Sequence, residues 1–261
     1  MLKLMKYEFI HSLRTYLTAF GLFLICCIMI PFAIEFNVAE LMPFISVLMG
    51  FAFTFFVAGI AIGMFVSIFT SFQRSMFKNQ GYLTLTLPVT TTELILSKMI
   101  VTAFWIFLGC CVLVFGIFLM VVIAGFISEG IFSSNVYDTI WRIICSMMEY
   151  VFYHPFDFIS DAFTIITTIT FVVASIYFSI TLMHTNYVRN HRMLFAVIFY
   201  VAFNIIVQST IGVVHESLIR ILGGTFSTNY LFLMMMFVYF IIGVLLTMGT
   251  IYLIDHHIEL E

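Results

Sequence analysis

The side chains that most often carry out catalysis form no recognisable catalytic pattern in this sequence. The seven histidines lie mostly in polar loops and at the flanks of apolar runs. No H-E-x-x-H or G-x-S-x-G segment occurs, and no pair of carboxylates lies inside an apolar run. A hydrolase working within a membrane needs a nucleophile or a metal held at depth, with a base beside it. We therefore predict no catalytic residue, no metal ligand and no enzymatic activity on this chain.

The five cysteines do not indicate a metal site either. Four of them form two adjacent pairs, at 26–27 and 110–111, and both pairs lie inside apolar runs. Neighbouring residues on a helix point in different directions, so such a pair does not chelate a metal. No C-x-x-C segment occurs, and we interpret the thiols as small apolar side chains that fill space.

Nucleotide chemistry is also missing from the sequence. A P-loop needs glycines that bring backbone amides to phosphate and a lysine that pairs with it, and no Gly-Lys dipeptide occurs here. We therefore expect any ATP and Mg²⁺ to bind a partner chain. The net charge of -3 and the lack of a basic stripe give no support for a nucleic-acid partner.

A few polar side chains lie within apolar runs. Asn204 and Gln208 are four residues apart and so share a helix face, as do Thr164 and Thr168. In lipid, such faces turn toward protein or a wet cavity. They have two interpretations, a substrate path and hydrogen bonding between helices, and the sequence does not separate them.

The elements that must position these side chains are membrane-spanning helices. The chain has 261 residues, of which 63% are apolar and only 9% charged, too few charges to cover a water-facing surface. About 20 apolar residues in a helix span the hydrocarbon layer. Six runs qualify as spans: 16–34, 44–70, 99–127, 162–183, 193–214 and 230–254. We predict an all-α, polytopic membrane protein with a single transmembrane domain over residues 1–261.

The positions of lysine and arginine predict the orientation. With the N-terminus inside, the inner segments hold Lys3, Lys6, Arg14, Arg74, Lys78, Lys98, Arg189 and Arg192. The outer segments then hold only Arg142 and Arg220. Both termini are therefore expected in the cytoplasm.

The segments outside the spans carry further predictions. Residues 1–15 have an apolar stripe at helical spacing, which favours an amphipathic helix on the inner leaflet. The inner segment 71–98 predicts a helix end, a turn, a short helix capped by the Thr90–Glu93 run, a second turn, and re-entry to the membrane at Lys98. The outer segment 128–161 predicts a helix on the outer leaflet or over a cavity, ending near His154-Pro155. Residues 215–229 read as the last outer loop.

Gly59 and Gly63 lie four residues apart in the second span. Small residues at this spacing let another helix approach closely. A dimer interface and packing within the chain are both open, and we favour packing within the chain because a polytopic protein has many helices of its own.

The run from 76 to 100, MFKNQGYLTLTLPVTTTELILSKMI, resembles permease subunits of the ABC-2 type of ABC exporter. The residues that carry the resemblance are Gly81, Tyr82, Leu83, Thr86, Leu87, Pro88, Val89, Thr90, Leu94, Ser97 and Lys98. The resemblance implies a six-span permease of the bacterial cytoplasmic membrane with an N-terminal elbow helix. It also implies that two permeases, identical or paralogous, work with two ATPase subunits.

In that family the loop between spans two and three forms a coupling helix that inserts into the ATPase subunit. The resemblance makes Phe77, Lys78, Asn79, Gln80, Gly81 and Tyr82 the candidate ATPase contact. The implied function is ATP-driven efflux of a peptide, a drug-like amphiphile or a lipid-type molecule. Two alternatives remain open: a secondary carrier, and an accessory membrane protein that works without an ATPase. Absence of ionisable groups within the spans weakens the carrier hypothesis, although unwound backbone is able to bind sodium.

Overall fold

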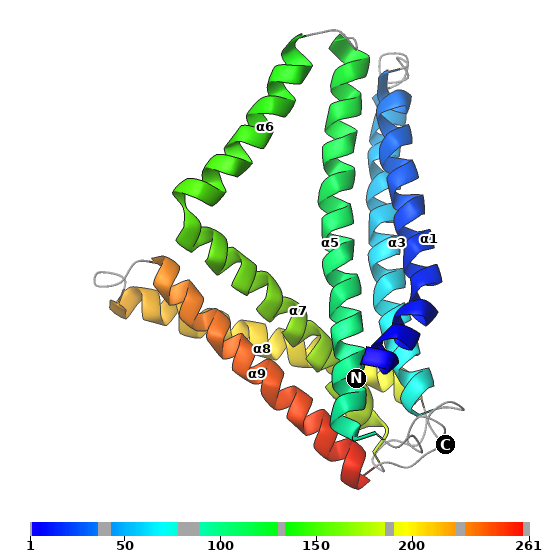
Figure 1. Ribbon diagram of the computed structural model, residues 1–261, viewed down its shortest axis with the longest axis vertical. Helices are drawn as coiled ribbons and strands as arrows, with labels where there is room; N and C mark the ends of the chain where they lie inside the picture. Colours follow the sequence, from blue (N-terminus) through cyan, green and yellow to red (C-terminus); the bar gives the residue numbers. More distant parts are fainter. Residues whose placement is uncertain are drawn as a thin grey trace. The chain divides into compact units, whose positions relative to one another are not determined.

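A computed structural model describes residues 2–35, 43–77, 89–129, 134–185, 191–222 and 228–257. These ranges contain helices and connecting turns, and no strand occurs in them (Figure 1). The helices are α1 (Leu2–Glu35), α3 (Pro43–Met76), α5 (Thr91–Glu129), α6 (Ser134–Tyr153), α7 (Pro155–Met183), α8 (Arg192–Leu222) and α9 (Thr228–His257).

Six of these helices are long and apolar enough to cross a membrane, which confirms the predicted number of spans. The segments are Ser12–Phe32, Phe53–Met76, Thr91–Ile127, Pro155–Met183, Arg192–Ile221 and Tyr230–His256. Only α6 among the described helices does not qualify, because its 20 residues include Asp138, Arg142 and Glu149. By length and composition, the chain is a multi-pass α-helical membrane protein.

Local chemistry accounts for where two of the helices begin. The Thr90 hydroxyl accepts a hydrogen bond from the Glu93 amide at 3.3 Å, so the predicted N-cap of α5 is confirmed. Pro155 opens α7 directly after the break at His154, because proline fits the first turn of a helix but cannot continue the one before it. The helix predicted within residues 128–161 and its end at His154-Pro155 are confirmed as well.

Several helices extend past the predicted segments, so the turn predicted at Lys98 and the loop predicted from residue 215 are wrong. The turn expected at Lys98 does not exist, since α5 is one helix from Thr91 to Glu129. α7 begins at Pro155 rather than at 162, and α8 continues to Leu222 through most of the expected last loop. The stretch 2–15 is helical as predicted, but it is continuous with the first span in α1. Backbone hydrogen bonds carry each helix past the point where the apolar run stops.

The chain forms two compact units. The first unit comprises Met1–Lys6, Ser67–Ala103 and Ile159–Glu261, and the second comprises Tyr7–Val66 and Phe104–Phe158.

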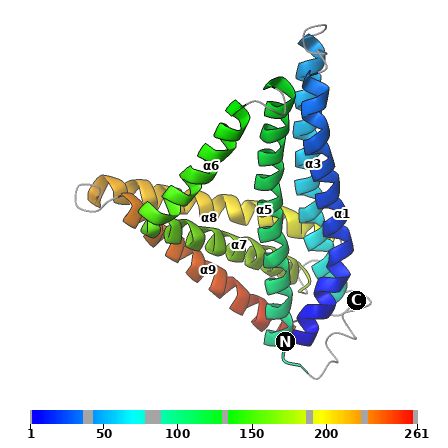
Figure 2. The ribbon, with the colours of Figure 1, turned by 45° about the horizontal axis from the view of Figure 1, so that its top comes forward.

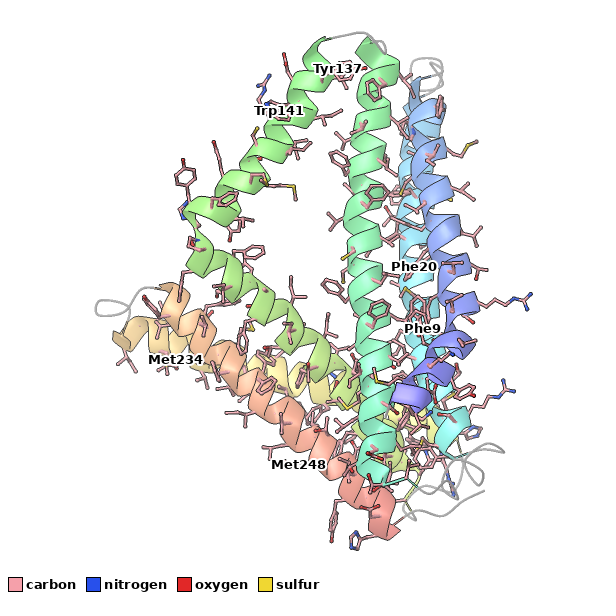
Figure 3. The ribbon with its side chains drawn as sticks, viewed as in Figure 1. Phe9, Phe20, Tyr137, Trp141, Met234 and Met248 are labelled. Carbon is pink, nitrogen blue, oxygen red and sulfur yellow. The ribbon has the colours of Figure 1, made fainter. Side chains whose placement is uncertain are left out.

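In the second unit, α1 packs against α5 through a tryptophan. Trp105 is only 2% exposed and is stacked between Phe9 and Tyr16, with both ring-centroid distances at 4.9 Å. Its indole N–H donates to the Ser12 hydroxyl at 2.8 Å. Figure 3 labels Phe9 and Phe20, which lie on the same helix as Ser12. The tryptophan therefore fixes the first half of α1 to α5.

Toward the C-terminal ends of α1 and α5, two glycines of α5 allow the helices to approach closely. A Cβ on Gly109 would lie 3.2 Å from Met64 Cε and 3.5 Å from Phe20, and a Cβ on Gly116 would lie 2.4 Å from Phe23 Cε1. The contacts advance together along both helices, so α1 and α5 run in parallel. Figures 1 and 2 show α1 and α3 side by side within this unit. Successive spans alternate in direction, so the first span, in α1, and the third span, in α5, must be parallel.

The Trp105 hydrogen bond gives a testable prediction. Ser12→Ala removes the acceptor of a buried indole N–H, and we expect a loss of stability of about 1–3 kcal/mol. Thermal denaturation of the detergent-solubilised protein measures it. Ser146→Ala is the matched control, because that hydroxyl is exposed and donates only to the Ile143 carbonyl of its own helix. Equal melting temperatures for the two variants would contradict the prediction.

In the first unit, α7 is the most buried of the candidate spans. Phe163 lies 5.1 Å from Phe237, and Phe171 lies 5.2 Å from Tyr239, ring centroid to ring centroid. Gly249 is close enough that a Cβ there would lie 3.1 Å from Phe178. These pairs also advance together, so α7 and α9 are parallel, as the fourth and sixth spans of a six-span protein must be. Met234 and Met248 mark the exposed side of α9 (Figure 3).

Candidate functional site

Phe77 is the only residue of the predicted ATPase contact that lies within the described residues. Lys78, Asn79, Gln80, Gly81 and Tyr82 lie outside them, as do the motif residues up to Pro88. Phe77 follows the last turn of α3, and its amide donates to the Gln73 carbonyl at 2.9 Å. Its ring is fully buried and points into the protein rather than outward. Phe77 therefore fixes the position at which the chain leaves α3.

The ring of Phe77 stacks on His184, at the end of α7. Their centroids are 4.2 Å apart and their planes 21° from parallel. His184 is 1% exposed, although the sequence places it at the start of a short basic loop. The connection from α3 to α5 and the connection from α7 to α8 thus begin from one packed pair of rings.

The contacts of His184 fit the neutral tautomer with the proton on Nδ1. Nδ1 lies 2.8 Å from the Ile180 carbonyl, and because a carbonyl only accepts, Nδ1 carries the proton. Nε2 lies 3.3 Å from Nε2 of Gln73, whose amide N–H donates to it. Both ring nitrogens are therefore bonded in the neutral form, and Gln73 adds a polar link between α3 and α7.

Tyr177 extends this arrangement to a third helix. Its ring stacks on Phe72 at 3.9 Å, and its hydroxyl lies 2.7 Å from the Thr102 hydroxyl of α5. We call Phe72, Gln73, Phe77, Thr102, Tyr177 and His184 the root cluster. It joins the end of α3, the first third of α5 and the end of α7, which a six-span topology places at the same side of the membrane.

The second half of the motif packs inward as well. Leu94, Ser97 and Lys98 are all buried, with Lys98 only 5% exposed. Ser97 donates to the Leu94 carbonyl at 2.8 Å within its own helix. With Thr90 as the N-cap, these residues fix where the helix that leaves the loop begins and which face it buries.

The predicted substrate-path residues show local hydrogen bonds. Asn204 donates to the Tyr200 carbonyl at 2.8 Å, and Thr164 donates to the Ser160 carbonyl at 2.9 Å, each within its own helix. Thr168 and Gln208 are exposed. The two pairs lie on different helices of the first unit, α7 and α8.

Gly59 and Gly63 are exposed, and a Cβ on either would meet no atom within 4 Å. Within their unit, the close approach that they predict occurs instead at Gly109 and Gly116 on α5. Those two glycines are seven residues apart and so share a helix face, a signal that the sequence analysis missed.

No group of three or more His, Cys, Asp or Glu side chains able to hold a metal ion occurs among the described residues. Comparisons with protein-family models, curated proteins and solved structures found no match. What the fold defines is a multi-pass helical membrane protein with a buried cluster at the root of its second-to-third-span loop.

Proposed function

We propose that the chain is the transmembrane permease subunit of an ATP-driven exporter whose ATPase is a separate chain. The partners in this proposal are an ABC ATPase subunit and a second permease, identical or paralogous. The cargo is a peptide, a drug-like amphiphile or a lipid-type molecule. The location is the bacterial cytoplasmic membrane, with both termini in the cytoplasm and an N-terminal elbow helix at the inner leaflet.

The root cluster is the observation that carries the proposal. A permease without a nucleotide site has to receive mechanical work through a cytoplasmic surface, and that surface needs a stiff attachment to more than one helix. Residues 78–88 follow the fully buried Phe77 at the end of α3 and precede Thr90, which caps α5. A force on this loop would therefore act on α3, α5 and α7 together.

The resemblance of residues 76–100 to ABC-2 permeases supplies the partner. In the proposal, Lys78, Asn79, Gln80, Gly81 and Tyr82 form the contact with the ATPase, and Phe77 anchors their loop from inside. Asn204, Gln208, Thr164 and Thr168 are the proposed polar contacts of the cargo.

Co-purification tests the proposal. We expect an affinity-tagged wild-type chain, expressed with the ATP-binding proteins of its own host, to bring down an ATPase subunit. The variants Lys78→Glu and Gly81→Trp should each reduce that recovery, and together at least tenfold. The first reverses a charge at the contact, and the second adds bulk there. Arg220→Glu is the control, since it reverses a charge near the end of α8, on the proposed outer side.

The outcomes separate the competing functions. Vesicles that move cargo with the purified chain alone would establish a secondary carrier instead. Recovery of an ATPase with the wild type and with both loop variants would place the contact elsewhere.

A further inference from the structure

The helix between the third and fourth spans, α6, has two chemically different faces. Tyr137, Trp141, Ile144, Met148 and Val151 recur three or four residues apart and form one face. The opposite face carries Asp138, Arg142, Ser146 and Glu149. Figure 3 labels Tyr137 and Trp141 on this helix. This segregation of charge is typical of a helix at a boundary between water and an apolar phase.

Most of the apolar face is uncovered. Val136 is buried against Gly125 of α5, and Tyr137 meets Phe126 edge to face at 5.8 Å, so the start of α6 is fixed to the end of α5. Beyond that first turn, Trp141 is 66% exposed and Met148 is 54% exposed. A large aromatic and a large thioether side chain at these exposures need an apolar environment.

The length of α6 does not decide what that environment is. Twenty residues of α-helix extend about 30 Å, which is also about the thickness of the hydrocarbon layer. A helix of this length can cross the bilayer or lie along it. The directions in which α5 and α7 cross the membrane distinguish these two placements of α6.

Contacts within the first unit supply those directions. The Tyr177 hydroxyl near the end of α7 lies 2.7 Å from the Thr102 hydroxyl in the first third of α5. The start of α5 and the end of α7 are therefore at the same depth and the same side of the membrane. Because each helix crosses once, the end of α5 and the start of α7 both lie at the opposite side. α6 connects those two points, so both of its ends are at one face and it does not cross.

We propose that α6 lies flat in the headgroup region of the leaflet at which α5 ends and α7 begins. The partner is a lipid surface, continuous with the lipid-facing surfaces of the two spans that α6 connects. Its apolar face enters the upper acyl chains, with Tyr137 and Trp141 at the level that aromatic side chains favour. Its charged face, with two acids and one arginine, stays in water. Since this face is not basic, the attraction is apolar and needs no anionic lipid.

The chain holds two tryptophans, which makes the depth of α6 measurable. Trp105→Phe leaves Trp141 as the only tryptophan of the full-length protein. The variant is reconstituted into phosphatidylcholine vesicles that carry bromine either near the headgroup end of the acyl chains or near their terminal methyls. We expect at least twofold stronger quenching of Trp141 by the shallow bromines than by the deep ones. Adding phosphatidylglycerol should leave this ratio unchanged.

Three results would overturn the proposal. Stronger quenching by deep bromines would show that α6 crosses the bilayer. Quenching by aqueous iodide without quenching by lipid would place the apolar face in water, and protection from both would place it against protein. Trp141→Phe is the matched control, because the remaining Trp105 is buried and should respond weakly to every quencher. If Trp105→Phe does not fold, the difference between wild type and Trp141→Phe gives the same signal. The proposal does not depend on the exporter function.

Discussion

Gly116→Leu should strongly destabilise the folded protein. A Cβ at this position would lie 2.4 Å from Cε1 and 3.1 Å from Cζ of Phe23, and 3.1 Å from Sγ of Cys27. Phe23 is 2% exposed and Cys27 is fully buried, so neither side chain can turn aside into solvent. Overpacking of a core by extra methylenes costs about 1–3 kcal/mol, and a leucine here adds four carbon atoms. We expect the upper end of that range or beyond, measured as loss of the monodisperse peak after heating in detergent.

Gly59→Leu is the matched control, because Gly59 is exposed on a helix and a Cβ there meets no atom within 4 Å. Replacing glycine within a helix also gains up to about 1 kcal/mol of helix propensity, so this variant should be as stable as wild type or more so. A Gly116→Leu protein with the melting temperature of Gly59→Leu would contradict the close packing of α1 on α5.

A second substitution tests the mechanism of that effect. Phe23→Ala removes the ring that a side chain at 116 would meet, and alone it destabilises by leaving a cavity. Combined with Gly116→Leu, it should recover part of the lost stability, because the new leucine fills the space. Strong non-additivity of this kind is the mark of two residues in direct contact.

The number of long apolar helices was predictable from the sequence, because crossing a lipid bilayer demands long apolar runs. Their ends were not, because apolarity stops where water begins while a helix continues as long as its backbone is bonded. Lys98 illustrates the difference. Its charge indicated the edge of the membrane and a turn, yet it lies buried in the second turn of an uninterrupted helix. Thr90 and Pro155 were placed correctly because capping and proline geometry act locally.

The root cluster lay beyond sequence reasoning, since its partners are far apart in the chain. Gln73 and His184 are 111 positions apart, and nothing local to His184 distinguishes it from the other polar residues of its loop. The close contact at Gly109 and Gly116 was not predictable for a related reason. Spacing shows that Gly59 and Gly63 share a face, but only the shape of the neighbouring helix shows that the face in close contact belongs to Gly109 and Gly116.

Phe77→Ala should have the largest effect of any substitution in the root cluster. The ring is fully buried between His184 and Phe72, and removing a buried phenylalanine ring costs about 3–5 kcal/mol. The loss removes one of the contacts between the end of α3 and the end of α7, beside the Gln73–His184 and Phe72–Tyr177 contacts. Thermal unfolding in detergent measures it, and Phe55→Ala is the matched control, because Phe55 lies on α3, the helix that precedes Phe77, but is 74% exposed. Equal unfolding temperatures for the two alanine variants would show that Phe77 does not anchor the loop.

Substitutions of His184 separate the two kinds of contact in the cluster. His184→Phe keeps a ring for Phe77 to stack on but removes the described acceptor of the Gln73 amide, which costs about 1–3 kcal/mol. His184→Ala removes the ring as well and should cost more. In the proposed exporter, both changes weaken the link between the loop and α7 while the contact surface at 78–82 is unaltered. ATPase recovery should therefore persist while ATP-dependent transport falls, in the order of the lost contacts. Transport at the wild-type rate in His184→Ala would show that work reaches α7 by another route.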